Sequence, residues 1–476
     1  MAMKRAGVLL IILVAALLRV YALEVVSTGV GSVSGLVADR SVAQLVVKGE
    51  IDARDLQFIS TCLDGLQQLD MSEATIVALS DGCAYFGDVL DYAADELPEY
   101  CFFAKSLSKV ALPAGLKVIG EGAFAGTSIC EIALPDRVEI IGDYAFSMCS
   151  ELTKVTLPVS VRTVGGGAFM GCVALKEADF GALKGDSRLG ERVMAHCASL
   201  EKVKLSNKLA EIPSGAFAQC SALVNVDFGV NSALTTIGNE AFACTALRTI
   251  DFQSLSRLES VGEWAFAGVQ LEQVTLSRGV ALYGEGVFFY NKAATTVKMT
   301  EGVKAIGAYA FDGCSAMNSV SMPSTLQSVG DRAFADNVSL DMVRVRAEAV
   351  PELGEDVFAG VNQSQATLYA PETTIHLYAN AEQWKEFVIV GEPLGVGDNR
   401  NGVEMKSYFD GAVLCIDASE TIAEVSIFGL DGVIYTATVV NSNNARVDMR
   451  GASLALYVAV VKFDNGNIKT VKLIRQ

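Results

Sequence analysis

The sequence is poor in histidine and in positive charge. His196 and His376 are its only histidines, and no two of its eleven cysteines form a C-x-x-C pair. No zinc signature, phosphate-cradling glycine loop or serine-centred nucleophile elbow occurs. These absences argue against a metal site, a nucleotide cofactor and a hydrolytic triad. We therefore expect no catalytic, cofactor-binding or metal-binding residues.

Lysine and arginine number 37 against 55 aspartate and glutamate residues, so the net charge is −18. Such a surface repels phosphate backbones and anionic lipid headgroups. We therefore expect no binding to nucleic acid or to membrane surfaces. Beyond the N-terminus, no apolar run reaches the roughly 20 residues that a spanning helix needs. We expect no transmembrane helix once the N-terminal segment described next is removed.

The N-terminus has the order of features typical of a secretory signal. Lys4 and Arg5 precede an apolar run over 6–18, and Val20 and Ala22 place small residues where a signal peptidase recognises its substrate. The apolar run is short for a membrane anchor. The sequence therefore predicts a signal peptide over residues 1–22 and a secreted or outer-surface protein.

A sequence repeat of about two dozen residues occurs along most of the chain. An Ala or Val precedes its central aromatic residue, Leu-x-x-Val-x-Leu follows, and Ile-Gly or Val-Gly closes it. Such a period predicts a solenoid, in which each unit buries its apolar side against its neighbours. The central position is occupied by Phe124, Phe146, Phe169, Met194, Phe217, Phe242, Phe266, Phe288, Phe311, Phe334 and Phe358.

Each repeat also contains a short alternating stretch that predicts a strand. Val155 and Leu157 point inward, and Lys154 and Thr156 point outward between them. The same stretch recurs eleven times, so we expect one continuous parallel ribbon with a polar outer face. Our candidate partner-binding residues on this face are Lys154, Thr156, Glu177, Asp179, Lys202, Lys204, Asn225, Asp227, Thr249 and Asp251. Their charge changes sign in blocks, which favours a partner of complementary charge; simple solvation of the face is the alternative.

Five cysteines stand three residues after the central Phe or Met of their repeats. Recurrence at one repeat position predicts buried free thiols stacked along the core, because free cysteine behaves as a small hydrophobic residue. Disulfides between neighbouring repeats are the alternative in an exported protein. These cysteines are Cys149, Cys172, Cys197, Cys220 and Cys314.

Units such as Ala145–Pro158 and Ala310–Pro323 resemble the BspA-like leucine-rich repeats of bacterial surface proteins, over about Leu97 to Val390. The resemblance implies a right-handed leucine-rich-repeat solenoid, a parallel β ribbon with short helical or irregular turns. It also implies partners such as host matrix proteins, other cells or glycoconjugates. Two repeats depart from the pattern, at Met194 and at Asn291, and we expect irregular turns there.

The flanks of the repeats predict caps for the two ends of the solenoid. Residues 23–96 form an N-terminal capping region, with strands over 45–51 and 66–71 and a helix over 52–62 between them. The solenoid with its closing segment spans 97–390, and Trp384 and Phe387 are suited to cover its last turn.

After residue 390 the repeat pattern ends. A Gly-rich polar linker spans 391–406, and 407–476 predict a small all-β sandwich with short alternating strands and hairpin turns. Three stretches resemble the C-terminal sorting modules of type IX secretion, which implies contact with the secretion machinery. An accessory β-domain is the alternative. The stretches are Val425–Gly432, Ala455–Val460 and Lys469–Arg475.

Together these features predict a secreted or cell-surface bacterial binding protein, adhesin-like, that uses the concave face of its solenoid. Its partner would be an extracellular protein or glycan of the host matrix or of other cells. A non-binding structural or assembly protein of the cell envelope is the alternative. An enzyme is the least favoured class: Cys197 follows His196, but it occupies the repeated core position.

Overall fold

The computed structural model describes residues 22–89, 91–252, 254–276, 279–280, 282–392, 405–410, 413–429, 434–450, 456–464 and 468–474. The chain divides into two compact units, one up to Ala370 with His376–Ile389, the other made of Pro371–Ile375 and the chain from Val390. The predicted signal peptide and linker lie largely outside the described residues. Each unit is considered by itself.

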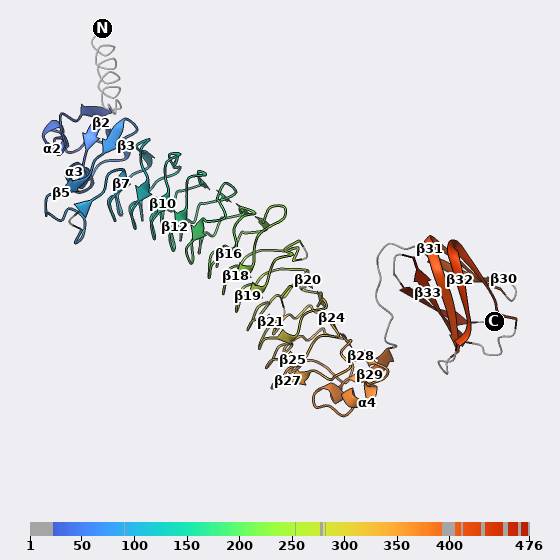
Figure 1. The fold of residues 1–476 in the computed structure, drawn as a ribbon. Helices are drawn as coiled ribbons and strands as arrows, with labels where there is room; N and C mark the ends of the chain where they lie inside the picture. Colours follow the sequence, from blue (N-terminus) through green and yellow to red (C-terminus); the bar gives the residue numbers. More distant parts are fainter. Residues whose placement is uncertain are drawn as a thin grey trace, which may run out of the picture. The chain divides into compact units, whose positions relative to one another are not determined.

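The first unit is a parallel β-solenoid with little helix, as predicted (Figure 1). Each turn, or rung, contributes short strands to two ladders that run along the solenoid. The first ladder continues from the N-terminal cap and carries the predicted outward residues; its outer side is called the strand face below. Its repeat strands are β8 (Lys109–Ala111), β11 (Lys154–Thr156), β13 (Glu177–Asp179), β15 (Lys202–Lys204), β17 (Asn225–Asp227), β20 (Gln273–Thr275), β22 (Thr296–Lys298), β24 (Ser319–Met322), β26 (Met342–Val345), β28 (Thr367–Pro371) and β29 (Val388–Glu392).

The second ladder consists of two-residue strands that end at the closing glycine of each repeat. Its strands are β7 (Glu96–Leu97), β9 (Val118–Ile119), β10 (Ile140–Ile141), β12 (Thr163–Val164), β14 (Arg188–Leu189), β16 (Glu211–Ile212), β18 (Thr236–Ile237), β19 (Ser260–Val261), β21 (Leu282–Tyr283), β23 (Ala305–Ile306), β25 (Ser328–Val329) and β27 (Glu352–Leu353). The closing glycines are required by close backbone approach. A Cβ at Gly165 would lie 2.4 Å from the backbone nitrogen of Asp143.

The prediction of one continuous ribbon is wrong. Nine of the eleven predicted stretches form strands, but Glu131 makes only an isolated bridge to Lys109. Residues 131–133 and 249–251 form no strand, so the first ladder is divided between β8 and β11 and again between β17 and β20. The second ladder is divided between β14 and β16, in the repeat whose central residue is Met194.

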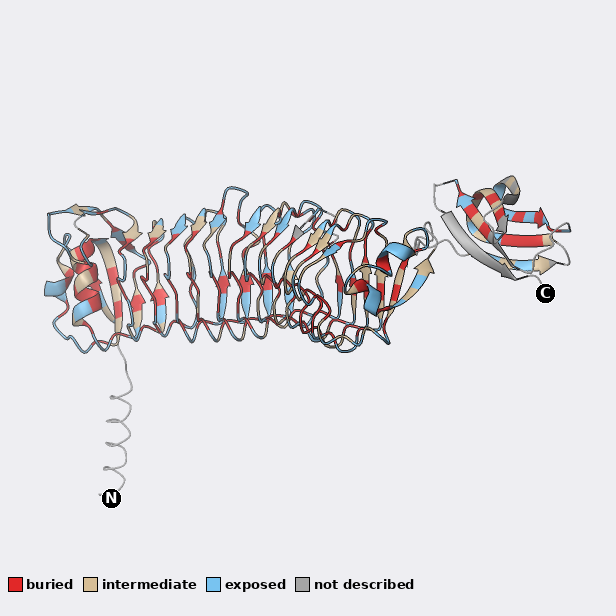
Figure 2. Cartoon of the chain, turned by 90° about the horizontal axis from the view of Figure 1, so that it is seen from below, coloured by how far each residue is buried: buried red, intermediate tan, exposed pale blue. Residues whose placement is uncertain are grey.

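The central residues of the repeats form an aromatic column inside the solenoid. Neighbouring rings stack with centroids 5.3–5.8 Å apart and interplanar angles of 2–24°, from Phe102 to Phe169 and again from Phe217 to Phe358. Met194 is fully buried in the gap between the two stacks. The column starts one repeat earlier than the sequence predicts, at Phe102. Figure 2 shows buried residues along the inner side of the rungs.

The backbone of these turns alternates between right- and left-handed conformations. Tyr144 and Met148, two residues before and after Phe146, have φ of 54° and 58°. The N–H groups of Tyr144, Phe146 and Met148 therefore all donate to carbonyls of the next rung, at 2.9, 2.7 and 2.7 Å. Glycine occupies such positions in several rungs, because an L residue is strained there.

The predicted thiol positions are buried and free. Cys149, Cys172, Cys197 and Cys220 have no exposed surface, and their Sγ atoms donate to the carbonyl of the preceding rung's Phe or Met at 3.1–3.2 Å. Burial raises the pKa of the Cys314 thiol, at the same repeat position, to about 12. Cys244, one position earlier in its repeat, is exposed.

The N-terminal cap has the predicted strands and helix. Its elements are β1 (Leu23–Val26), α2 (Val33–Leu36), β2 (Gln44–Ile51), α3 (Ala53–Cys62), β3 (Gln68–Asp70), β4 (Ala74–Ile76), β5 (Leu79–Ser80) and β6 (Asp91–Tyr92). Asp52 caps α3, and the buried Asp55 accepts from the N–H groups of Gly31 and Val33 at 2.8 and 2.9 Å. The order β1-β2-β3-β8 continues the first ladder and covers the first rung.

The last rung is covered by α4 (Ile375–Tyr378) and the 3-10 helix η1 (Trp384–Glu386). Trp384 and Phe387 meet the ring of Phe358 at 61° and 87°, with centroids 5.4 and 5.0 Å away. The prediction that these two residues close the aromatic column is confirmed.

The C-terminal region is all-β, as predicted. It consists of β30 (Met405–Asp410), β31 (Val413–Gly429), β32 (Ile434–Asp448), β33 (Leu456–Phe463) and β34 (Ile468–Ile474). All its pairings are antiparallel, and β31 pairs with β30, β32 and β33. A separate core that includes Leu414, Ile427 and Phe463 holds it together.

Replacing Phe146 by Ala should lower the free energy of unfolding by about 3–5 kcal/mol, because it leaves a cavity between two stacked rings. Urea unfolding followed by the fluorescence of Trp264 and Trp384 measures this. Val230→Ala, at a site 81% exposed, is the control and should change the free energy by less than about 0.5 kcal/mol. A loss below about 1 kcal/mol for Phe146→Ala would contradict the role given to the column.

The native protein should be alkylated at Cys83, Cys130 and Cys244, which are exposed, and not at the buried thiols. Iodoacetamide reacts with the thiolate, and a buried thiol is neither accessible nor ionised. Peptide mass mapping after labelling at pH 8 measures this, with the guanidinium-unfolded, unreduced protein as the control in which all cysteines react. A disulfide-linked pair of peptides, such as those of Cys149 and Cys172, would contradict the free-thiol assignment.

Candidate functional site

All ten predicted partner-binding residues lie along two hollows of the strand face. The smaller, of about 310 Å³, is lined by the outward residues of β11, β13, β15 and β17. The larger, of about 1020 Å³, lies where the ladder is divided, and it is lined in part by Asn225, Asp227, Thr249 and Asp251. Thr249 and Asp251 therefore belong to the set, although the strand predicted for them does not form.

The blocks of charge in the smaller hollow are explained by pairing within the sheet. The register places Glu177 opposite Lys202 and Asp179 opposite Lys204. The Nζ atoms of the lysines lie 4.0 and 3.4 Å from the carboxylates. Opposite charges on adjacent strands stabilise the ladder, which is an explanation of these blocks that needs no partner. The partner of complementary charge stays a prediction for this part of the face.

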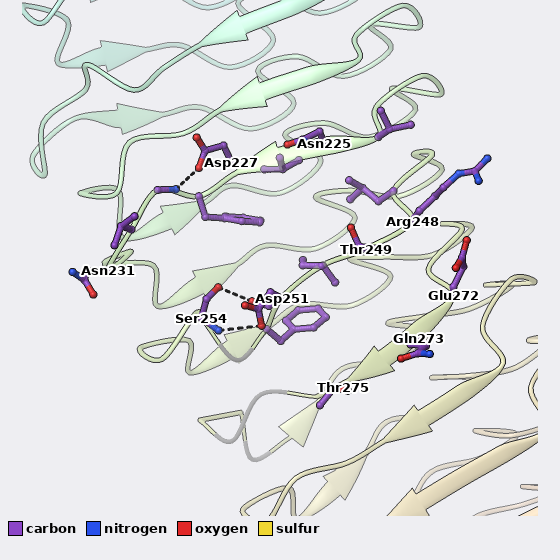
Figure 3. Close-up of a pocket in the computed structure, with 18 residues that line it drawn as sticks. Asn225, Asp227, Asn231, Arg248, Thr249, Asp251, Ser254, Glu272, Gln273 and Thr275 are labelled. Atoms are coloured by element: carbon purple, nitrogen blue, oxygen red, sulfur yellow. Dashed lines mark hydrogen bonds between the residues drawn. The ribbon is translucent and has the colours of Figure 1, made fainter. Parts of the chain in front are cut away.

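The larger hollow is a cleft between two successive rungs. One wall is β17 and the residues that follow it to Asn231, and the other is the segment 247–252 with Ser254 (Figure 3). Glu272, Gln273 and Thr275 of the next rung complete the lining. In the second ladder the same two rungs remain joined, since Thr236 of β18 pairs with Ser260 of β19. The rungs therefore separate only on the strand face.

The edge of β17 that faces this cleft has backbone groups without partners in the sheet. Asn225 and Asp227 hydrogen-bond to the preceding rung: Asn225 N–H donates to Glu201, and Asp227 accepts from Leu205 N–H at 2.8 Å. Backbone groups alternate in direction along a strand, so those of Val226 and Phe228 point into the cleft. No backbone hydrogen bond joins Val226 or Phe228 to the segment 247–252 in the described part of the chain.

The floor of the cleft exposes apolar side chains that other rungs bury. The inward residue of the strand, such as Val155, Val203 or Val274, is buried in the other repeats, with at most 9% of its surface exposed. At the cleft the corresponding residues, Val226 and Ile250, are only half-buried. The separation of the rungs has therefore opened the core to solvent at this point.

Two phenylalanines in successive rungs account for the break. The last inward position of the strand is Leu, Met or Val in most repeats, but Phe228 and Phe252 occupy it in neighbouring rungs. A single Phe at this position, Phe180, is fully buried between Leu157 and Leu205. Two successive ones overfill the space: Phe252 packs against Phe266 and Phe288, and Phe228 stays half-buried. This pair is the signal of the cleft in the sequence, and the repeat pattern alone does not reveal it.

Carboxylates predominate on the rim of the cleft. Asp227 accepts from the nearby Gly229 N–H at 2.8 Å, and Asp251 accepts from Ser254 N–H at 3.3 Å. Glu272 is exposed on the next rung, and Arg248 is the cation of the lining. The arrangement combines an open strand edge, an apolar floor and a negative rim, which suits an extended, positively charged partner.

The part of the chain that the structure describes holds no group of three or more His, Cys, Asp or Glu side chains arranged to bind a metal ion. It also holds no helix of the length and hydropathy required to cross a bilayer.

Comparison with known proteins identifies the repeats. The model of the BspA type leucine-rich repeat region matches residues 95–183, 184–294 and 284–383, and no curated protein matches. A leucine-rich repeat protein from Bacteroides ovatus is 21% identical, with 73% of this chain and 88% of that one covered and a TM-score of 0.49. A leucine-rich cell surface protein from Faecalibacterium prausnitzii is 19% identical, with 65% and 83% covered and a TM-score of 0.37. The family model matches more than half of the chain, which therefore belongs to the BspA type leucine-rich repeat family.

Proposed function

We propose that this protein is a secreted or surface-displayed bacterial binding protein, adhesin-like, whose strand face holds an extracellular protein partner. The observation that carries the proposal is the cleft of about 1020 Å³ in that face, where an apolar floor and a strand edge are both open. A spacer needs only a regular stack of rungs and gains nothing from such an opening. Membership of the BspA type repeat family supports the same class of function.

Arginine substitutions on the strand face test whether the partner binds there. Thr156→Arg combined with Asn225→Arg should abolish capture of the partner from extracellular matrix or from surface extracts of other bacteria. Both residues line the hollows with outward side chains, so the fold should persist. Capture followed by mass spectrometry, with circular dichroism to check folding, measures the effect.

The matched control places arginines on the second ladder. Glu211 and Ser260 are exposed on β16 and β19, and Glu211→Arg with Ser260→Arg adds two arginines away from the strand face. The control should capture the same proteins as the unchanged chain. Equal capture by the two double variants contradicts a binding strand face, and capture of nothing by the unchanged chain favours a structural role in the envelope.

We also propose that the C-terminal region serves export or surface attachment. Its own hydrophobic core, with Leu414, Ile427 and Phe463 among its members, supports a unit that is separable from the solenoid. Its resemblance to type IX sorting modules, in Val425–Gly432 and two further stretches, supports the role. Parts of these stretches lie outside the described residues.

A chain ending at Glu392 should fold and bind its partner but remain inside the cell envelope. The reason is that the solenoid, with both caps, is complete before that residue, whereas the proposed export module is removed. Fractionation of cells that express the full and shortened chains measures this, with partner capture as the check on folding. Normal surface display of the shortened chain would contradict a sorting role.

A further inference from the structure

We propose that the edge of β17 binds a short extended segment of the partner protein as an added strand, and that this segment alternates basic and apolar side chains. The inference rests on the proposed function, because it names how the same face holds its partner. The backbone groups, the shape, the floor and the rim of the cleft all favour such a segment.

The open backbone groups provide the first argument. The N–H groups of Val226 and Phe228 and the carbonyl of Val226 point away from β15 and into the cleft. An exposed strand edge of this kind is a template for another strand, and main-chain hydrogen bonds then supply affinity. In a regular solenoid every such group is paired with the next rung, so β17 differs from the strands β11, β13 and β15, whose next-rung partners are in place.

The shape of the cleft provides the second argument. A strand needs a spacing of about 4.8 Å from its neighbour, and the cleft offers about 1020 Å³ next to β17. The rungs on either side stay joined through β18 and β19 and through the stacked rings of Phe242 and Phe266, 5.3 Å apart. The cleft is therefore held open before the partner arrives, which lowers the entropic cost of binding.

The floor and rim define the side chains of the segment. Alternate residues of an added strand point to opposite faces of the sheet. Those facing inward would cover Val226 and Ile250, which are half-buried, and would be apolar. Those facing outward would lie near the carboxylates of Asp227 and Glu272, both exposed, and would be basic. A partner with this pattern is attracted by the rim and also removes apolar surface from water.

A glycan fits this cleft less well than a peptide. Sugar rings commonly pack on an exposed aromatic face, and the aromatic residues of the lining are Phe228 and Phe252. Phe252 is 1% exposed, and Phe228 is half-buried and meets Phe242 edge-on at 71°. The open amide groups, in contrast, match a peptide backbone. Glycan binding is therefore treated as an outcome that would overturn the inference.

The test uses the full chain and a fluorescein-labelled synthetic peptide of alternating lysine and valine. Fluorescence anisotropy should show saturable binding that weakens as salt is raised. The same peptide with N-methylated amides on alternate residues keeps its charge and side chains but cannot pair with β17. It should bind about tenfold more weakly or worse, because two or more hydrogen bonds are lost. Equal binding of the two peptides overturns the added strand.

Variants of the cleft complete the test. Asp227→Asn with Glu272→Gln should weaken binding several-fold, whereas Glu211→Gln, an exposed carboxylate on the second ladder, should not change it. Val226→Pro removes an edge donor but no hydrogen bond to β15, and it should abolish binding with the circular dichroism spectrum unchanged. If Val226→Pro disturbs folding, the comparison of the two peptides on the unchanged chain decides the matter.

The outcomes separate this inference from the proposed function. In one outcome, arginines on the strand face abolish partner capture, but the alternating peptide does not bind. This outcome overturns the added strand and leaves the binding function intact. Binding of glycans in the cleft, blocked by Asp227→Asn and without peptide binding, also overturns it. Capture that the arginines on the strand face leave unchanged overturns the strand face as the binding site, and capture of nothing by the unchanged chain overturns the binding function itself.

Discussion

The solenoid depends on the contact between the turns that carry the central Phe. Each turn alternates left- and right-handed residues, so every second N–H group donates to the next rung, and neighbouring Phe rings stack at 5.3–5.8 Å. These contacts fix the spacing and the phase of every rung relative to its neighbours. The strands then meet in register because the turns have already aligned them. A rung with Met in place of Phe fits this scheme because the flexible side chain of Met194 is fully buried at the same repeat position.

Because the turns and the second ladder hold the rungs together, the strand face is free to vary. Residues 249–251 lose their strand, yet Phe242 and Phe266 still stack and β18 still pairs with β19. A break in an isolated sheet would expose two edges and destabilise the whole sheet. In a solenoid with three lines of contact, the loss of one costs little and leaves a preformed opening. A binding surface can therefore form most readily on the strand face, because this side of each rung contributes least to the alignment of neighbouring rungs.

The sequence predicts the fold well because the rule that specifies it is repeated. The Phe spacing predicts the column, the alternation around Val155 predicts the strands, and the recurrence of Cys149 and Cys172 predicts buried thiols; all agree with the structure. The cleft was not predicted, because it depends on the sum of two side-chain volumes. Phe228 and Phe252 each satisfy the repeat as apolar residues, and only their adjacency in successive rungs exceeds the available space.

The charges of the strand face are also explained by which residues lie next to one another in the folded chain. Lys202 and Lys204 appear as an uncompensated pair in the sequence, but the parallel register places them opposite Glu177 and Asp179. Where the register continues, charge is balanced inside the sheet and gives little attraction for a partner. Where it is interrupted, Asp227 lies beside a cleft instead of a strand, and the described residues that line this cleft include Arg248 but no lysine. The same break thus opens the backbone edge, exposes the apolar floor and leaves more carboxylates than cations on the rim, and these three effects favour one kind of partner at one place.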